Sequence, residues 1–209
     1  MTTTEPKQKT IITADQYRAL QRQVELPTPQ ALFDFVVETL VAKELATYKH
    51  ADPFRNKLPS SGLFLLIPPR PEELDLAHLM ELIEFRGKTG TNHLNAGNLK
   101  DEVKVPDGPY LVTDAEDGSG RLNTKPSVSK ANILKENRSP YLAFEGIIHT
   151  VVFPSVFETH NMDLCGSRCK GRGVPDLYLN DDKPKLNADW YDSASPEWGA
   201  PSCGSRVGA

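Results

Sequence analysis

The fold of this chain is decided by residues 162–179, which read MDLCGSRCKGRGVPDLYL. The apolar residues at the two ends, 162–165 and 174–179, have the composition of strands, and the stretch between them collects glycines and cations. This pattern predicts two paired strands around a basic, glycine-rich turn. Because helix signals dominate the earlier part of the chain, the whole sequence predicts an α+β fold with N-terminal helices packed on a small mixed or antiparallel sheet.

The N-terminal part, residues 13–50, is predicted to be helical and to follow a flexible stretch of residues 1–12. Residues 13–16 have the form of a capping box, and Thr28 followed by Pro29 starts a second helix that reaches about Tyr48. Apolar residues on two faces of this second helix predict either burial on both sides or contact with a partner chain. The candidate partner contact consists of Leu32, Phe33 and Val37, together with Trp198 near the C-terminus.

Further elements are predicted from local patterns between residues 62 and 157. The continuous apolar run 62–67 is typical of a central strand covered on both faces, and residues 110–113 form another strand. Residues 74–85 fit either a helix or a late strand, and the polar stretch 86–105 is predicted to be a loop. Thr124 and Pro126 start a helix through Leu134, and an apolar run extends from Tyr141 to Phe157.

Length and charge restrict the class of protein. The 209 residues suit a single domain, predicted over residues 13–209, and a net charge of -4 argues against a broad nucleic-acid surface. The first residues are polar, and no apolar run approaches the roughly 20 residues of a membrane span, so we expect no membrane contact and a cytoplasmic location. Three cysteines make a disulfide framework unexpected.

The basic turn is the best candidate for a ligand site. Glycine N–H groups and arginines are suited to hold carboxylate, phosphate or sulfate oxygens, so a small anionic ligand is predicted there. The alternative is an exposed turn whose cations pair with surface acids. The candidate ligand-binding residues are Arg138, Gly166, Ser167, Arg168, Lys170 and Arg172.

Glu145 is the candidate catalytic residue, because it lies between Phe144 and Gly146 in an apolar run. Burial there would raise its pKa and make it a general base. The alternative is a structural carboxylate that accepts hydrogen bonds from Arg138 or Arg168.

The cysteines allow two further hypotheses. Cys165 and Cys169 lie four residues apart beside Arg168 and Lys170, which is the setting of a reactive thiol. A zinc site would need His160 and Cys203 as additional ligands, and the spacing is unusual for zinc. Ordinary packed or exposed thiols are the alternative, and no metal or cofactor is predicted.

Six short motifs follow one another along the second half of the chain. They are Arg138-Ser139-Pro140, Glu145-Gly146-Ile147, Gly166-Ser167-Arg168, Arg172-Gly173-Val174-Pro175, Pro184-Lys185-Leu186 and Ala200-Pro201-Ser202-Cys203. Through these motifs the chain resembles the uncharacterised actinobacterial domain-of-unknown-function family 5701, over roughly residues 62–206. The resemblance implies a bacterial origin and a single cytosolic domain, and it brings no assigned activity.

The chain departs from this family pattern at two histidines. Family members carry an Asn-Pro-His-Thr-Trp run after the Pro-Lys-Leu motif, where this chain has residues 187–191, NADWY, and a further family histidine corresponds to Val152. The departures favour an accessory or binding subunit that stabilises or completes the site of a partner enzyme in a bacterial metabolic pathway. The alternative is a small cytosolic enzyme that acts on an anionic metabolite through an Arg/Glu pocket.

Overall fold

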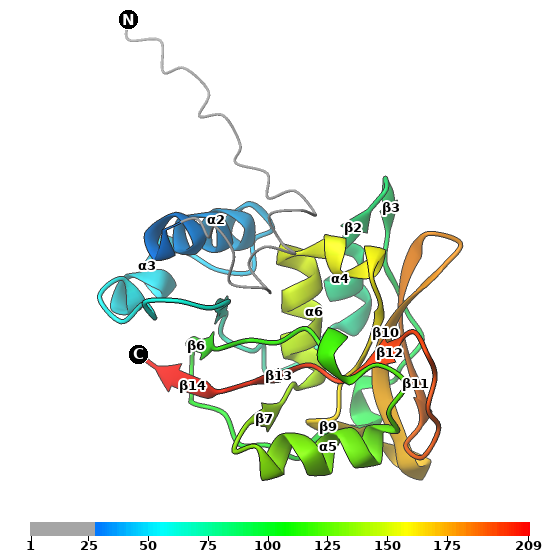
Figure 1. Cartoon of the computed structure of the whole chain (residues 1–209). Helices are drawn as coiled ribbons and strands as arrows, with labels where there is room; N and C mark the ends of the chain where they lie inside the picture. The colour runs from blue at the N-terminus through cyan, green and yellow to red at the C-terminus, as the bar shows by residue number, and fades with distance from the viewer. Residues whose placement is uncertain (1–27) are drawn as a thin grey trace, which may run out of the picture.

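The apolar run after Tyr141 forms helix α6 (Ala143–Val152), and every residue of this helix is buried. A helix that is apolar all round has to be covered on every side. In the computed structural model, which describes residues 28–209, α6 lies in the middle of the molecule (Figure 1). Strands β6 (Tyr110–Thr113) and β14 (Ser205–Gly208) lie on one side of it, and β10 (Gly173–Asn180) and β11 (Lys183–Trp190) lie on the other. The helix predicted from residues 13–16 lies outside the described residues.

One side of α6 is covered by three antiparallel strands from the described residues. These are β1 (Leu65–Ile67), β6 (Tyr110–Thr113) and β14 (Ser205–Gly208), in the order β1-β6-β14. The prediction that residues 62–67 form a central strand is wrong, because β1 lies at the edge of its sheet. Its apolar run is explained by α2 (Pro29–Ala42) and α6, which contact β1 and leave all three of its residues buried.

The larger sheet contains seven strands within residues 28–209, with β12-β8-β10-β11-β4 as its main order. The predicted strand pair is confirmed, because β8 and β10 pair antiparallel with Met162 opposite Leu177. Strand β10 also forms a long hairpin with β11. The members are β4 (Thr91–Asn92), β5 (Leu99–Asp101), β8 (Asn161–Asp163), β9 (Ser167–Cys169), β10 (Gly173–Asn180), β11 (Lys183–Trp190) and β12 (Trp198–Gly199).

Helix α2 (Pro29–Ala42) begins as predicted, with the Thr28 side chain accepting a hydrogen bond from the Ala31 N–H. It ends earlier than the predicted Tyr48, because Glu44 takes a left-handed backbone conformation (φ 59°). The N–H groups of Glu44 and Leu45 then bond back to the carbonyls of Val41 and Leu40, which is a Schellman motif.

The predicted partner contact on α2 is corrected by the burial of its residues. Leu32, Phe33 and Val37 are 2%, 0% and 1% exposed and belong to the core of the chain itself, where α2 contacts β1 and α6. The alternative prediction, burial on two sides, describes this helix. Trp198 is partly buried and packs against Tyr178 of β10 in a tilted arrangement, with ring centroids 5.6 Å apart.

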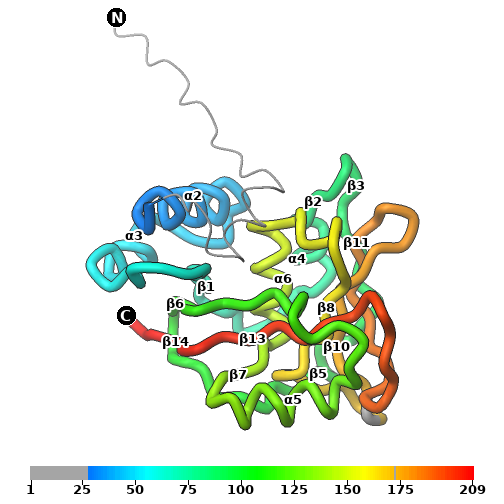
Figure 2. Tube along the Cα trace, viewed as in Figure 1, coloured from blue at the N-terminus to red at the C-terminus, as the bar shows by residue number. Residues whose placement is uncertain are grey.

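The remaining elements complete an α+β fold, as predicted. Residues 74–85 supply both a helix and a strand, and residues 86–105 are not a plain loop, because β4 and β5 pair with distant strands. Helix α5 runs along one edge of the molecule, on the far side from α2 (Figure 2). These elements are α3 (Tyr48–Ala51), α4 (Leu76–Glu81), α5 (Pro126–Lys135), β2 (Glu84–Phe85), β3 (Lys88–Thr89), β7 (Ser139–Pro140), β13 (Ser202–Cys203) and the 3-10 helices η1 (Asp52–Phe54), η2 (Ala96–Asn98), η3 (Ser119–Arg121), η4 (Pro154–Glu158) and η5 (Lys170–Arg172).

Candidate functional site

The polar groups at the start of the basic turn are used inside the fold. The Gly166 N–H donates to the carbonyl of Tyr141 at 2.7 Å. The buried Ser167 hydroxyl accepts from the Ala143 N–H at 2.9 Å and donates to a carboxylate oxygen of Asp101 at 2.5 Å. Gly166 and Ser167 therefore anchor β9 to the start of α6, and these two groups are not available to an anion.

The Arg168 side chain packs on the ring of Tyr191 and lies near Glu102. Its guanidinium carbon lies 3.5 Å from the centroid of the Tyr191 ring, and its Nη2 lies 3.6 Å from Glu102 Oε2. Lys130 donates a hydrogen bond to the same carboxylate. Burial raises the pKa of Glu102, but the bonds and charges of Lys130 and Arg168 outweigh it and hold this pKa below its ordinary value. Arg168 thus pairs with an acid of the chain itself, as the alternative interpretation expected, but its side chain is only 19% exposed and is not the freely exposed cation of that interpretation.

Arg138 binds a different set of groups. It donates to the side chain and the carbonyl of Asp114 and to the hydroxyl of Ser202, and its Nε lies 3.3 Å from Glu116. Arg138 and Arg168 thus have no partner in common, and the predicted convergence of arginines on one anion is wrong for these two residues. Lys170 lies in η5, and the Arg172 side chain lies outside the described part of the structure.

Glu145, in the first turn of α6, accepts four hydrogen bonds and is completely buried. Oε1 accepts from Arg206 Nε at 2.6 Å and from the Tyr110 hydroxyl at 2.9 Å. Oε2 accepts from Arg206 Nη2 at 2.7 Å and from the Leu142 N–H at 2.8 Å. Each carboxylate oxygen thus accepts two hydrogen bonds, which fills the hydrogen-bonding capacity of the group.

Arg206, on the last strand β14, is the partner of Glu145 that the sequence did not reveal. Burial lowers the pKa of Arg206, but the hydrogen bonds and charge of Glu145 outweigh it and raise this pKa above its ordinary value. Its remaining N–H groups donate to the Ser139 hydroxyl and the Pro140 carbonyl. Glu145 is therefore the structural carboxylate of the second hypothesis, with Arg206 in place of Arg138 or Arg168.

The thiols are poorly suited to chemistry. Burial raises the pKa of Cys165 far above its ordinary value, and it also raises the pKa of Cys203 to about 12 and that of the half-buried Cys169. A high pKa leaves little thiolate at neutral pH. Within residues 28–209, no three or more His, Cys, Asp and Glu side chains are arranged as a metal site.

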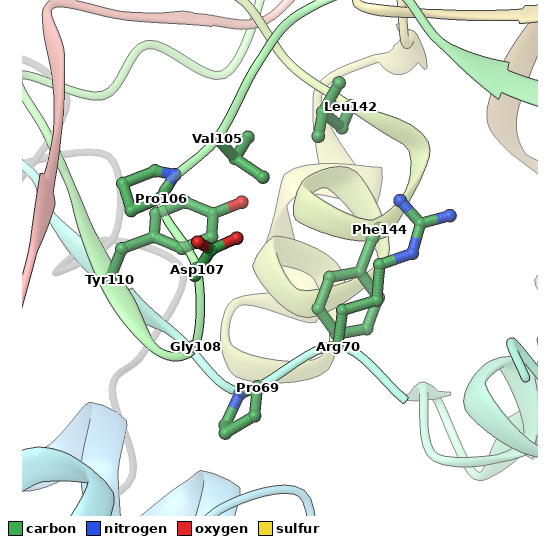
Figure 3. A pocket seen from close by; sticks show the side chains of 9 residues that line it. All are labelled: Pro69, Arg70, Val105, Pro106, Asp107, Gly108, Tyr110, Leu142 and Phe144. Carbon is green, nitrogen blue, oxygen red and sulfur yellow. The ribbon is translucent and has the colours of Figure 1, made fainter. Parts of the chain in front are cut away.

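Two adjoining pockets form the open concave site that we call the Phe144 groove. The first has a volume of about 260 Å³ and lies between α6 and the loop before β6, and the second has about 290 Å³ and lies toward α4. Pro69 and Phe144 line both pockets, so these two residues stand between them. In Figure 3, Phe144 of α6 and Leu142, the residue just before this helix, face the first pocket from one side, and Pro106, Asp107 and Tyr110 border it from the other.

Charges surround this groove unevenly. Arg70 lines the first pocket but is paired with Asp101, and Asp107 lies at the opposite border. The second pocket is lined by Glu44, Glu73 and Asp75 together with His78. No local motif marks these residues as a site, because they come from the end of α2, the loop after β1 and the start of α4. The one sequence signal for this groove is that Glu73 and Asp75 follow closely after the proline-rich residues 68–71.

The fold and the groove define an α+β protein whose buried Glu145–Arg206 pair is satisfied internally and whose open concave surface is bordered by carboxylates. By its sequence, the chain belongs to the family of unknown function DUF5701, whose family model matches residues 25–209. The predicted resemblance is therefore confirmed, and it extends further toward the N-terminus than expected. No curated protein and no solved structure matches the chain. No helix among residues 28–209 has both the length and the apolar character needed to cross a membrane.

Proposed function

We propose that this chain is an accessory subunit that binds a partner enzyme of a bacterial metabolic pathway in the cytoplasm and has no catalytic centre of its own. The observation that carries the proposal is the filled hydrogen-bonding capacity of Glu145. A general base needs an oxygen that can reach a substrate proton. Both oxygens of Glu145 are instead held by Arg206, Tyr110 and the Leu142 N–H.

The Phe144 groove supports the binding part of the proposal. The groove lies next to the buried Glu145, because Tyr110 and Leu142 take part in both places. Both residues line the groove, and the Tyr110 hydroxyl and the Leu142 N–H donate hydrogen bonds to Glu145. A rigid concave surface next to a buried ion pair is held in shape before a partner arrives, which lowers the entropy cost of association. Trp198, partly buried beside Tyr178, remains a candidate partner contact outside the groove.

The enzyme hypothesis placed Arg168 and Arg172 on the substrate, with Arg138 in support and Glu145 as the acid or base of one pocket. Of these, the structure describes the side chains of Arg138, Arg168 and Glu145. Each of these side chains binds a different set of groups, so this arrangement gives the enzyme hypothesis no support. We therefore put forward a single function.

The experiment that tests the proposal uses tagged full-length protein purified from its native host. We expect a single enzyme to co-purify in stoichiometric amount, and we expect the activity or thermal stability of that purified enzyme to rise when the purified chain is added back. A chain that emerges alone and turns over a metabolite without a partner would contradict the proposal. So would a co-purified enzyme that behaves identically with and without the chain.

A further inference from the structure

We propose that the Phe144 groove binds a basic segment of the partner protein, with a Lys or Arg side chain seated among Glu44, Glu73 and Asp75. This inference rests on the proposed function and names the chemistry of the partner. Four features of the groove support it: the shape, the charge, the apolar floor and the backbone that holds the carboxylates in place.

The shape favours a segment of chain over a single compact ligand. The groove consists of two neighbouring compartments, of about 260 and 290 Å³. Phe144 and Pro69 line both pockets. Two side chains of one extended segment can occupy two such compartments, because alternate residues of a strand-like segment point to the same side.

The charge of the groove selects a cation. Glu44, Glu73 and Asp75 line one pocket and Asp107 lines the other, and the described residues form no ion pair with any of these four carboxylates. The one lining arginine, Arg70, already has Asp101 as its partner. Several carboxylates that line one groove attract and orient a cationic group, so a Lys or Arg side chain is the complementary ligand.

The floor suits the long stem of such a side chain. Phe144 and Leu79 are each 3% exposed and line the second pocket together with the partly buried Leu45. Lys and Arg pack their methylene stems along apolar surface while the charged end stays near water and carboxylates. A neutral polar segment would have no charged end to pair with these carboxylates.

The backbone holds the carboxylates without a segment being present. Glu44 occupies the left-handed position of the Schellman motif after α2, where glycine or asparagine fits at lower cost. Asp75 is the N-cap of α4 and accepts from the His78 N–H at 3.0 Å. Pro68, Pro69 and Pro71 restrict the intervening loop, so little chain entropy is lost on binding.

The test is a selection of peptides by the intact chain. A phage-displayed library of random dodecapeptides is selected on the full-length protein, and the enriched peptides are synthesised with a fluorescent label for anisotropy titrations. The groove variant carries Glu44→Asn and Glu73→Gln, which remove two charges and keep a residue that tolerates the left-handed conformation at position 44. The control variant carries Glu38→Gln and Glu84→Gln, two exposed acids that do not line the groove.

We expect the enriched peptides to share a Lys or Arg beside an apolar residue. The groove variant should bind them about tenfold more weakly and the control variant within about twofold of the unmodified chain, because two charged contacts are lost only in the first. Affinity should also fall between about 50 mM and about 300 mM salt. Circular dichroism melts of both variants check that they fold.

Several outcomes would overturn the inference. These are enrichment of neutral or acidic peptides, failure to enrich any peptide, or equal binding by both variants. A concentration-dependent dimer that the groove variant alone abolishes would replace the partner segment with a second copy of the chain. If the partner enzyme still binds the groove variant fully, the proposed function stands and only the basic segment is excluded.

Discussion

Asp163 on β8 and Asp176 on β10 lie directly opposite each other in the larger sheet, and they are only 4% and 1% exposed. Opposed residues of an antiparallel pair share one face, with Cβ atoms about 4.5–5.5 Å apart. Burial, together with the charges of nearby acids, raises the pKa of Asp163 to about 7 and that of Asp176 to about 8. Two buried carboxylates at this separation cannot both ionise readily, so the pair keeps a proton at neutral pH.

The acid pair predicts that stability falls as the pH rises. Between the ordinary aspartate pKa of about 4 and the raised values near 7 and 8, the folded chain binds more protons than the unfolded chain, so the free energy of unfolding decreases with pH across this window. Asp176→Asn should flatten this slope and raise the free energy of unfolding near pH 9 by about 1–3 kcal/mol. Urea unfolding from about pH 5 to 9 measures both effects.

The matched control for this prediction is Asp107→Asn, because Asp107 is exposed. Its pH profile should follow that of the unmodified chain. A profile for Asp176→Asn with an unchanged slope would show that the pair does not hold the proton.

Glu145→Gln should destabilise the fold by about 3–5 kcal/mol, because it leaves Arg206 buried without a counter-charge. The side chain of Arg206 is only 6% exposed, so water cannot take the place of the carboxylate. A double-mutant cycle with Arg206→Met, followed by urea unfolding, measures the coupling. The double variant should lose less free energy than the two single losses added together, and strictly additive losses would contradict a direct pair.

Gly166→Ala should cost about 2–3 kcal/mol. A Cβ atom at this position would lie 2.5 Å from the Tyr141 carbonyl oxygen and 2.7 Å from that of Pro140, and backbone atoms cannot move aside as side-chain ends can. Gly120→Ala is the control, since a Cβ there meets nothing within 4 Å, and its change should stay within about 0.5 kcal/mol. Thermal melts of the two variants compare them, and equal melting temperatures would count against the close approach of β9 to the loop before α6.

The thiols should react slowly in the folded chain. Cys165 and Cys203 are completely buried, whereas Cys169 is partly exposed. Titration with an aromatic disulfide reagent near pH 8 should label Cys169 alone, and all three cysteines should react after unfolding in urea. Rapid labelling of Cys165 in the folded state, or a Cys165–Cys169 disulfide after mild peroxide, would instead support a redox function.

Local signals predicted several elements correctly. The Thr28-Pro29 start of α2 and the Pro126 start of α5 depend on hydrogen bonds and φ values within a few residues, which a sequence displays directly. The strand pair around the basic turn also follows from one continuous stretch of sequence. The end of α2 was missed because Glu44 adopts a conformation that usually marks glycine.

The candidate site was predicted less well, because its contacts join residues far apart in the chain. Glu145 was expected beside Arg138 or Arg168 on the basis of charge alone, and its partner, Arg206, lies 61 residues away on the last strand. The basic turn was expected to offer its N–H groups to an anion. In the structure the Gly166 N–H binds the Tyr141 carbonyl, because β9 passes close to the start of α6.

The sequence by itself determined the α+β class, since apolar periodicity, caps and turn residues act over a few positions. Its short motifs determined the family. Only the tertiary structure decided which charges neutralise one another, that Glu145 is closed to a substrate, and that carboxylates from three separate segments border the Phe144 groove. The physical reason is that Coulombic and hydrogen-bonding partners are selected by distance in space, and the packing of both sheets around α6 sets those distances.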